Sequence, residues 1–219
     1  MLLDRKKVKF WQKIIFGFMA FLMVGFGISI GAIMGAFPGC GAEGPKPAEE
    51  RIEELQVQLK ASPSSAATLL ALARAYQEVG AQEPQGSDRQ IAAWDQAAQY
   101  YELYVEQLEA DVEAGGGPAR TQELVEAYKT LASLYTTIGD VDALVVVYGK
   151  LTDAVPNDAD NYLFYGQAAQ NAGQTDLAIL AYRKYLELEP DSQFAEDVRA
   201  LLEELTGEPV PAPTATDGG

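Results

Sequence analysis

The stretch from residue 125 to residue 192 decides the fold, because it contains one 34-residue pattern twice in succession. The first copy, residues 125–158, reads VEAYKTLASLYTTIGDVDALVVVYGKLTDAVPND, and the second, residues 159–192, reads ADNYLFYGQAAQNAGQTDLAILAYRKYLELEPDS. The identical pairs, each 34 positions apart, include Tyr128 and Tyr162, Gly139 and Gly173, Tyr148 and Tyr182, and Pro156 and Pro190. A fixed period of this length is typical of proteins that stack one supersecondary unit.

Each copy predicts a helical hairpin. Apolar residues recur at helical spacing on both sides of the central glycine, and a proline ends the second run. Small residues such as Ala132 and Gly166 allow close helix crossing, and the repeated tyrosines are expected to fill the core rather than to bind a cofactor. One hairpin cannot bury its apolar face alone, so neighbouring hairpins are expected to stack.

Related patterns precede the two copies. Residues 66–80 repeat the first-helix pattern, and a second helix resumes after an insertion at residues 81–92. Ser87 and Gln90 predict a capping box at this new helix start.

Partial units lie at both ends of the repeats. An amphipathic segment that runs into Pro63 predicts the second half of another unit, and residues 193–205 predict a closing amphipathic helix. We therefore expect an all-α solenoid of about three helical hairpins with capping helices over residues 49–205.

The order of residue types resembles the tetratricopeptide-repeat (TPR) family of bacterial membrane-anchored proteins. In the second copy the matching residues are Tyr162, Tyr165, Gly166, Ala169, Gly173, Ala178, Tyr182 and Pro190. The resemblance implies a concave groove, lined by the first helices, that binds a peptide or helix of a partner protein. The residues that it places in this groove are Leu70, Arg74, Gln77, Lys129, Ser133, Thr136, Leu163, Gln167, Gln170 and Asn171.

Arg74 and Lys129 stand out among these residues, because both are basic in a very acidic domain. A basic side chain in the groove is a candidate for binding a carboxylate or a backbone carbonyl of the partner. The alternative is a solvated helix face with neutralising ion pairs, such as Arg74 with Glu78.

Residues 14–37 form an uncharged run, IIFGFMAFLMVGFGISIGAIMGAF. At about 1.5 Å per residue, a helix of this length crosses a hydrocarbon core of roughly 30 Å. The preceding residues 1–13 carry five basic side chains and one acidic side chain, and positive flanks stay in the cytoplasm. The sequence thus predicts a single-pass cell-membrane anchor with a basic cytoplasmic N-terminus and an extracytoplasmic, periplasmic TPR domain.

Two alternatives stay open for this segment. Cys40-Gly41-Ala42 offers a cleavage site, although the apolar cores of signal peptides usually span about 7–15 residues. Gly39-Cys40 fits the end of a lipobox, which would make Cys40 a lipidation site.

Glycines recur at a fixed spacing within this segment, and glycines and prolines are frequent in the linker that follows it. Gly27, Gly31 and Gly35 recur every four residues, a spacing that favours packing against another membrane helix. Residues 38–48 are rich in glycine and proline and predict a linker, and residues 206–219 predict a disordered tail.

Charge and composition exclude several classes of function. Residues 14–219 hold 11 basic against 31 acidic side chains, a net charge of −20, which repels nucleic acid. The chain has no histidine and one cysteine, so the commonest general base and metal ligand is absent and neither a disulfide within the chain nor a thiolate cluster can form. We expect a protein that is not an enzyme and that uses neither a cofactor nor a metal.

Three functions remain consistent with these observations. The first is a membrane-anchored scaffold or adaptor that binds a segment of a partner protein. The second is an assembly factor, since residues 52–80 look like the opening of the TPR domains in c-type cytochrome biogenesis proteins. The third is an accessory subunit of a membrane complex, with the glycine stripe as its contact inside the membrane.

Overall fold

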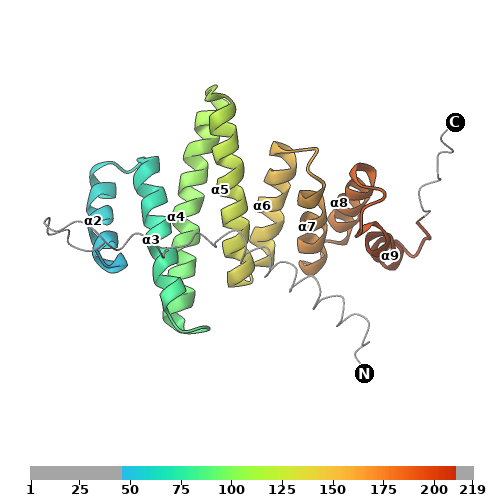
Figure 1. Cartoon of the computed structure of the whole chain (residues 1–219), viewed down its shortest axis with the longest axis horizontal. Coiled ribbons are helices and arrows are strands. Elements are labelled where there is room, and N and C mark those ends of the chain that lie inside the picture. The colour runs from blue at the N-terminus through green and yellow to red at the C-terminus, as the bar shows by residue number, and fades with distance from the viewer. Residues whose placement is uncertain (1–45, 211–219) are drawn as a thin grey trace, which may run out of the picture. The chain divides into compact units, whose positions relative to one another are not determined.

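The computed structural model describes residues 46–210, which form a series of packed helices (Figure 1). The helices are α2 (Ala48–Ala61), α3 (Ala66–Gln82), α4 (Asp88–Glu113), α5 (Gly117–Ile138), α6 (Val141–Ala154), α7 (Ala159–Asn171), α8 (Thr175–Leu188) and α9 (Ala195–Thr206). Within this part of the chain there is no strand, and each helix packs against the helices before and after it in sequence. This arrangement confirms an all-α fold and is consistent with the predicted TPR solenoid.

Three hairpins, α3/α4, α5/α6 and α7/α8, lie between the flanking helices α2 and α9. Gly139 and Gly173 stand at equivalent turns of the last two hairpins, with φ of +86° and +72°. This left-handed conformation favours glycine and explains why the residue recurs. Asp140 then caps the start of α6, where its side chain accepts a hydrogen bond from the Ala143 N–H at 3.0 Å.

The insertion after the first helix pattern becomes a tight connection between α3 and α4. Ser87 caps α4 by accepting a hydrogen bond from the Gln90 N–H at 3.1 Å, as predicted. The Gln90 side chain accepts a hydrogen bond from the Gly86 N–H at 2.8 Å and donates one to the Gly80 carbonyl at 3.0 Å. Gln90 therefore binds both ends of the loop, but only half of the predicted capping box forms, because the Ser87 N–H donates to the Pro84 carbonyl at 3.1 Å instead of to Gln90.

The middle of the molecule differs most from the predicted pattern. Helices α4 and α5 have 26 and 22 residues, and Figure 1 shows their joined ends extending beyond α3 and α6. The connection between them is short, because Gly115 and Gly117 adopt φ of +92° and +75° and Pro118 stands in the first turn of α5. The result is an extended hairpin end that the 34-residue template does not contain.

The apolar core forms three clusters along the array. The first contains buried residues of α2 and α3, the second extends from α3 to α6, and the third extends from α6 to α9. Tyr128 and Tyr182 are buried, and Tyr148 and Tyr162 are partly buried against the core. The prediction that the repeated tyrosines serve packing is thus confirmed.

Several predicted features lie outside the described residues. They are the basic N-terminus 1–13, the membrane segment 14–37, the stripe of Gly27, Gly31 and Gly35, Cys40, and residues 211–219 of the tail. Ala48, which the sequence assigns to the linker 38–48, is the first residue of α2. Among residues 46–210, no helix combines the length and the hydropathy required to span a bilayer.

Candidate partner-binding surface

The ten residues predicted to line a groove do not share one environment. The exposed members are Arg74, Lys129, Thr136 and Asn171. The half-buried members are Leu70, Gln77, Ser133, Gln167 and Gln170. Leu163 is buried, with 7% of its surface exposed, and packs in the cluster formed by α6 to α9. Its side chain belongs to the core, in contrast to the groove position that the family resemblance gives it.

Two of the half-buried glutamines hold their own hairpins together. Gln77 Oε1 accepts a hydrogen bond from the Tyr101 hydroxyl at 3.1 Å, and Gln170 Oε1 accepts one from the Tyr182 hydroxyl at 2.9 Å. The two glutamines occupy equivalent positions in α3 and α7, so the same bond recurs in the first and last hairpins. Their carbonyl oxygens are therefore already occupied by internal bonds.

The two basic candidates differ in how they are neutralised. Lys129 Nζ lies 3.7 Å from Glu126 Oε1 on the same helix, an exposed pair that contributes about 0.5 kcal/mol at most. Arg74 forms no ion pair with any carboxylate of residues 46–210, and the expected partner Glu78 binds Arg51 of α2 instead. Arg74 lies close enough to Tyr101 to offset, in part, the rise in pKa that burial imposes on this phenol.

A pocket of about 380 Å³ surrounds Arg74 at the junction of α2 and α3. Its lining comprises Arg51, Glu54, Leu55 and Gln58 from α2, and Ala71, Arg74, Ala75 and Glu78 from α3. The lining combines apolar side chains with charges of both signs. The sequence did not predict that residues of α2 take part in this pocket.

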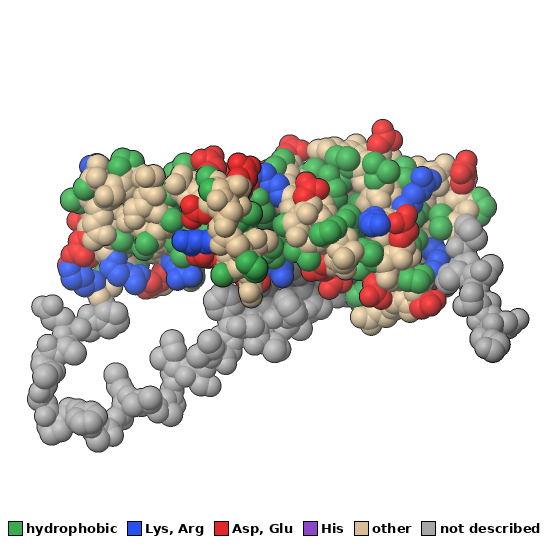
Figure 2. Space-filling view, turned by 90° about the horizontal axis from the view of Figure 1, so that it is seen from above, with side chains coloured by type: hydrophobic (Ala, Val, Ile, Leu, Met, Phe, Trp, Pro, Cys, Tyr) green, Lys and Arg blue, Asp and Glu red, His purple; other side chains and the backbone are tan. Residues whose placement is uncertain are grey.

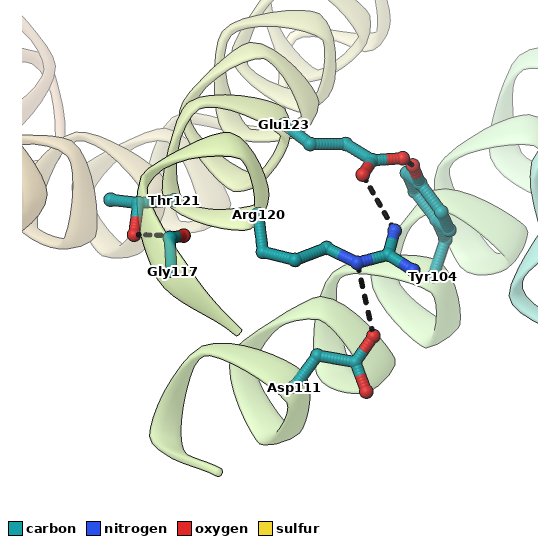
Figure 3. Close-up of polar contacts among 6 residues, drawn as sticks. All are labelled: Tyr104, Asp111, Gly117, Arg120, Thr121 and Glu123. Atoms are coloured by element: carbon teal, nitrogen blue, oxygen red, sulfur yellow. Dashed lines mark hydrogen bonds and ion pairs between the residues drawn. The ribbon is translucent and has the colours of Figure 1, made fainter. Parts of the chain in front are cut away.

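Tyrosine-to-glutamate hydrogen bonds join α4 to α5, and the sequence did not reveal them. Figure 3 shows one of these bonds, in which the Tyr104 hydroxyl donates to Glu123 at 2.5 Å. Arg120 binds the other oxygen of Glu123 at 2.6 Å and lies 3.5 Å from Asp111. The bonds from Tyr104 and Arg120 hold the pKa of Glu123 below its usual value, while burial raises the pKa of Tyr104.

Glu109 connects three helices. It accepts hydrogen bonds from the Tyr128 hydroxyl of α5 and from Lys150 of α6, and Lys150 Nζ lies 5.8 Å from the centre of the Tyr128 ring. Burial alone would raise the pKa of Glu109, but the bonds from Lys150 and Tyr128 outweigh it and lower the pKa. A carboxylate with a lowered pKa stabilises the fold above its ordinary pKa and loses this contribution as the pH falls.

Replacing Glu109 with glutamine should therefore lower the free energy of unfolding by about 1 kcal/mol at neutral pH, after allowance for solvent screening. The difference from the wild type should shrink once the pH falls below 4.5, the ordinary value for glutamate. Urea titrations followed by circular dichroism at several pH values provide the measurement. The control is Glu106→Gln, because Glu106 is exposed on the same helix and forms no ion pair within residues 46–210. Equal losses in the two variants would contradict the assignment.

Charge is distributed unevenly along the array. Residues 46–89 hold five basic and seven acidic side chains, whereas residues 90–210 hold six basic and 22 acidic ones. On the face seen in Figure 2, basic side chains gather at the α2 end and acidic ones are spread over the rest. Within residues 46–210 no group of three or more acidic or sulfur ligands is placed to hold a metal ion.

Comparison with known proteins yields similarity only to solved structures. No protein-family model and no curated protein matches the chain. A structure titled "Crystal structure of MamA protein" shares 22% identity over 73% of this chain and 74% of that chain, with a TM-score of 0.46. A second MamA structure shares 20% identity over 73% of this chain and 80% of that chain, with a TM-score of 0.43. The "APC/C hetero-tetramer Cut9-Hcn1" shares 14% identity over 73% of this chain and 39% of that chain, with a TM-score of 0.33.

Proposed function

We propose that this protein is a non-enzymatic scaffold that binds a segment of a partner protein, and that its N-terminal segment anchors it in the cell membrane with the helical domain outside the cytoplasm. The observation that carries the binding role is the array of helical hairpins with basic and amide side chains left exposed on its first helices, among them Arg74, Lys129 and Asn171. Such side chains suit hydrogen bonds to the carboxylates and backbone carbonyls of a protein segment.

The chemistry of the chain supports a binding role over catalysis. The domain has no histidine, and its carboxylates with perturbed pKa values, Glu109 and Glu123, are engaged by tyrosines and basic residues inside helix interfaces. Perturbed groups of this kind stabilise packing rather than face a substrate. The apolar run at residues 14–37 and the basic residues before it support the proposed anchoring and orientation.

The test is purification of the full-length protein from its native membranes in mild detergent, with mass spectrometry of the associated proteins. Lys129→Glu should lower recovery of a specific partner by about tenfold, which corresponds to about 1.4 kcal/mol of binding free energy. The control is Arg183→Glu, the same change of charge on the second helix α8, where recovery should be unchanged. Equal recovery with wild type and Lys129→Glu would contradict binding through the first helices.

An accessory subunit of a membrane complex is the second candidate, and the stripe of Gly27, Gly31 and Gly35 favours it. The same purification with Gly31→Ile distinguishes the two. Loss of stoichiometric membrane subunits in this variant alone would assign the contact to the membrane segment. Haem-protein clients that depend on Lys129 would instead favour an assembly factor.

A further inference from the structure

The pocket between α2 and α3 lies where the repeat pattern calls for another helix. Arg51, Leu55 and Gln58 stand 12, 8 and 5 residues before Pro63, and three residues of α8 stand at the same distances before Pro190. These three are Ala178, Tyr182 and Tyr185, all buried in the core cluster that α8 shares with its neighbouring helices. The corresponding face of α2 has no first helix of its own unit among residues 46–210, and the pocket opens there.

The lining residues form two helical stripes. On α2 they are spaced i, i+3, i+4 and i+7, from Arg51 to Gln58, and on α3 the same spacing runs from Ala71 to Glu78. Residues at this spacing share one face of a helix. Two neighbouring helices that each present such a stripe over about two turns form a groove into which a third helix can pack.

The polar groups of the pocket favour an acidic occupant. Its carboxylates are already paired, Glu54 with Lys46 and Glu78 with Arg51. The remaining donors are not fully used: Arg74 has no carboxylate partner within residues 46–210, and the buried Nε of Arg51 has no hydrogen-bond partner in that range. The same pocket is lined by the apolar side chains of Leu55, Ala71 and Ala75, which suit small apolar side chains of an occupant.

We propose that this pocket docks a helix of a partner protein that carries a carboxylate opposite Arg74 on an otherwise small and apolar face. The partner helix takes the place of the first helix that α2 lacks among the described residues. This inference rests on the proposed scaffold function and assigns it one binding site. The guanidinium supplies a charge-assisted hydrogen bond, and the apolar lining residues supply burial.

Fluorescence anisotropy with the full-length protein in mild detergent tests the proposal. The probes are three labelled alanine/leucine helices of about 14 residues, or four turns, with glutamate, glutamine or lysine as the single central polar residue. The wild type should bind the glutamate helix about tenfold more tightly than the lysine helix, and Arg74→Glu should invert this preference. Because inversion requires tight binding of the lysine helix, a misfolded variant cannot produce it.

The matched control is Arg183→Glu, an equal change of charge on an exposed face of α8 outside the pocket, which should leave the preference unchanged. Absence of binding to the wild type, as expected if another part of the chain fills the pocket, would overturn the proposal. So would a preference that Arg74→Glu leaves unaltered or that Arg183→Glu alters equally. Partner recovery that depends on Lys129 but not on Arg74 would overturn the pocket assignment while the scaffold function stands.

Discussion

Replacing Gly166 with alanine should lower the free energy of unfolding by about 2 kcal/mol, even though alanine is the better helix former. A Cβ atom at Gly166 would lie within 3.0 Å of three ring atoms of Tyr182, which is 0% exposed. The ring cannot move without disturbing the packed core around it, and overpacking of this kind costs about 3 kcal/mol. The gain in helix propensity offsets about 1 kcal/mol of this loss.

The control for this variant is Gly149→Ala, the same substitution within α6. There the nearest side-chain atom is the Tyr165 hydroxyl oxygen at 3.5 Å, an ordinary contact, so the helix propensity of alanine should stabilise the protein by about 0.5–1 kcal/mol. Urea unfolding of the full-length protein in mild detergent, followed by circular dichroism, compares the two variants. A stabilising Gly166→Ala would show that α7 and α8 are not so closely packed.

A second substitution separates the clash from other effects of alanine. In a Tyr182→Leu background the aromatic ring is gone, so Gly166→Ala should lose most of its penalty. The interaction energy from the double-mutant cycle should be about 2 kcal/mol. If Gly166→Ala lowered the free energy of unfolding equally in both backgrounds, the loss would not come from contact with the Tyr182 ring.

The close contact between Gly166 and Tyr182 could be predicted from the sequence. The 34-residue period aligns Gly166 with Ala132 and Tyr182 with Tyr148, and small residues opposite large ones are what closely crossing helices require. The hairpin turns at Gly139 and Gly173 and the cap at Ser87 were equally accessible, because each depends on local backbone chemistry. Features fixed by local conformation or by the repeat therefore follow from sequence.

The hydrogen-bond and ion-pair partners of individual polar side chains could not be predicted in this way. A glutamine at the position of Gln77 or Gln170 can face a bound peptide or reach a tyrosine of its own hairpin, and both choices satisfy the same sequence pattern. The outcome depends on how two helices pack against each other, which the repeat pattern does not specify. For the same reason Glu78 binds Arg51, 27 residues away, rather than Arg74 at the expected helical spacing.

The extended end of α4 and α5 is the other feature that the 34-residue period does not predict. Residues between Tyr104 and Glu113 have good helix formers at helical spacing, so the helix continues past the point at which a standard unit ends. Tyrosine-to-glutamate bonds, such as that from Tyr104 to Glu123, then join the added turns of α4 to α5. A template of fixed length assigns these residues to a loop because no other copy contains them.

Replacing Leu108 with alanine should lower the free energy of unfolding by about 3 kcal/mol, because Leu108 lies in this extension and is 0% exposed. Leu103→Ala, on the same helix at a site that is 43% exposed, should change it by about 0.5 kcal/mol. Urea unfolding again gives both values. A small loss at Leu108 would mean that the added turns are not part of the core. A large loss, combined with unchanged binding of the glutamate helix by the folded variant, would show that the extension stabilises the array without forming the pocket between α2 and α3.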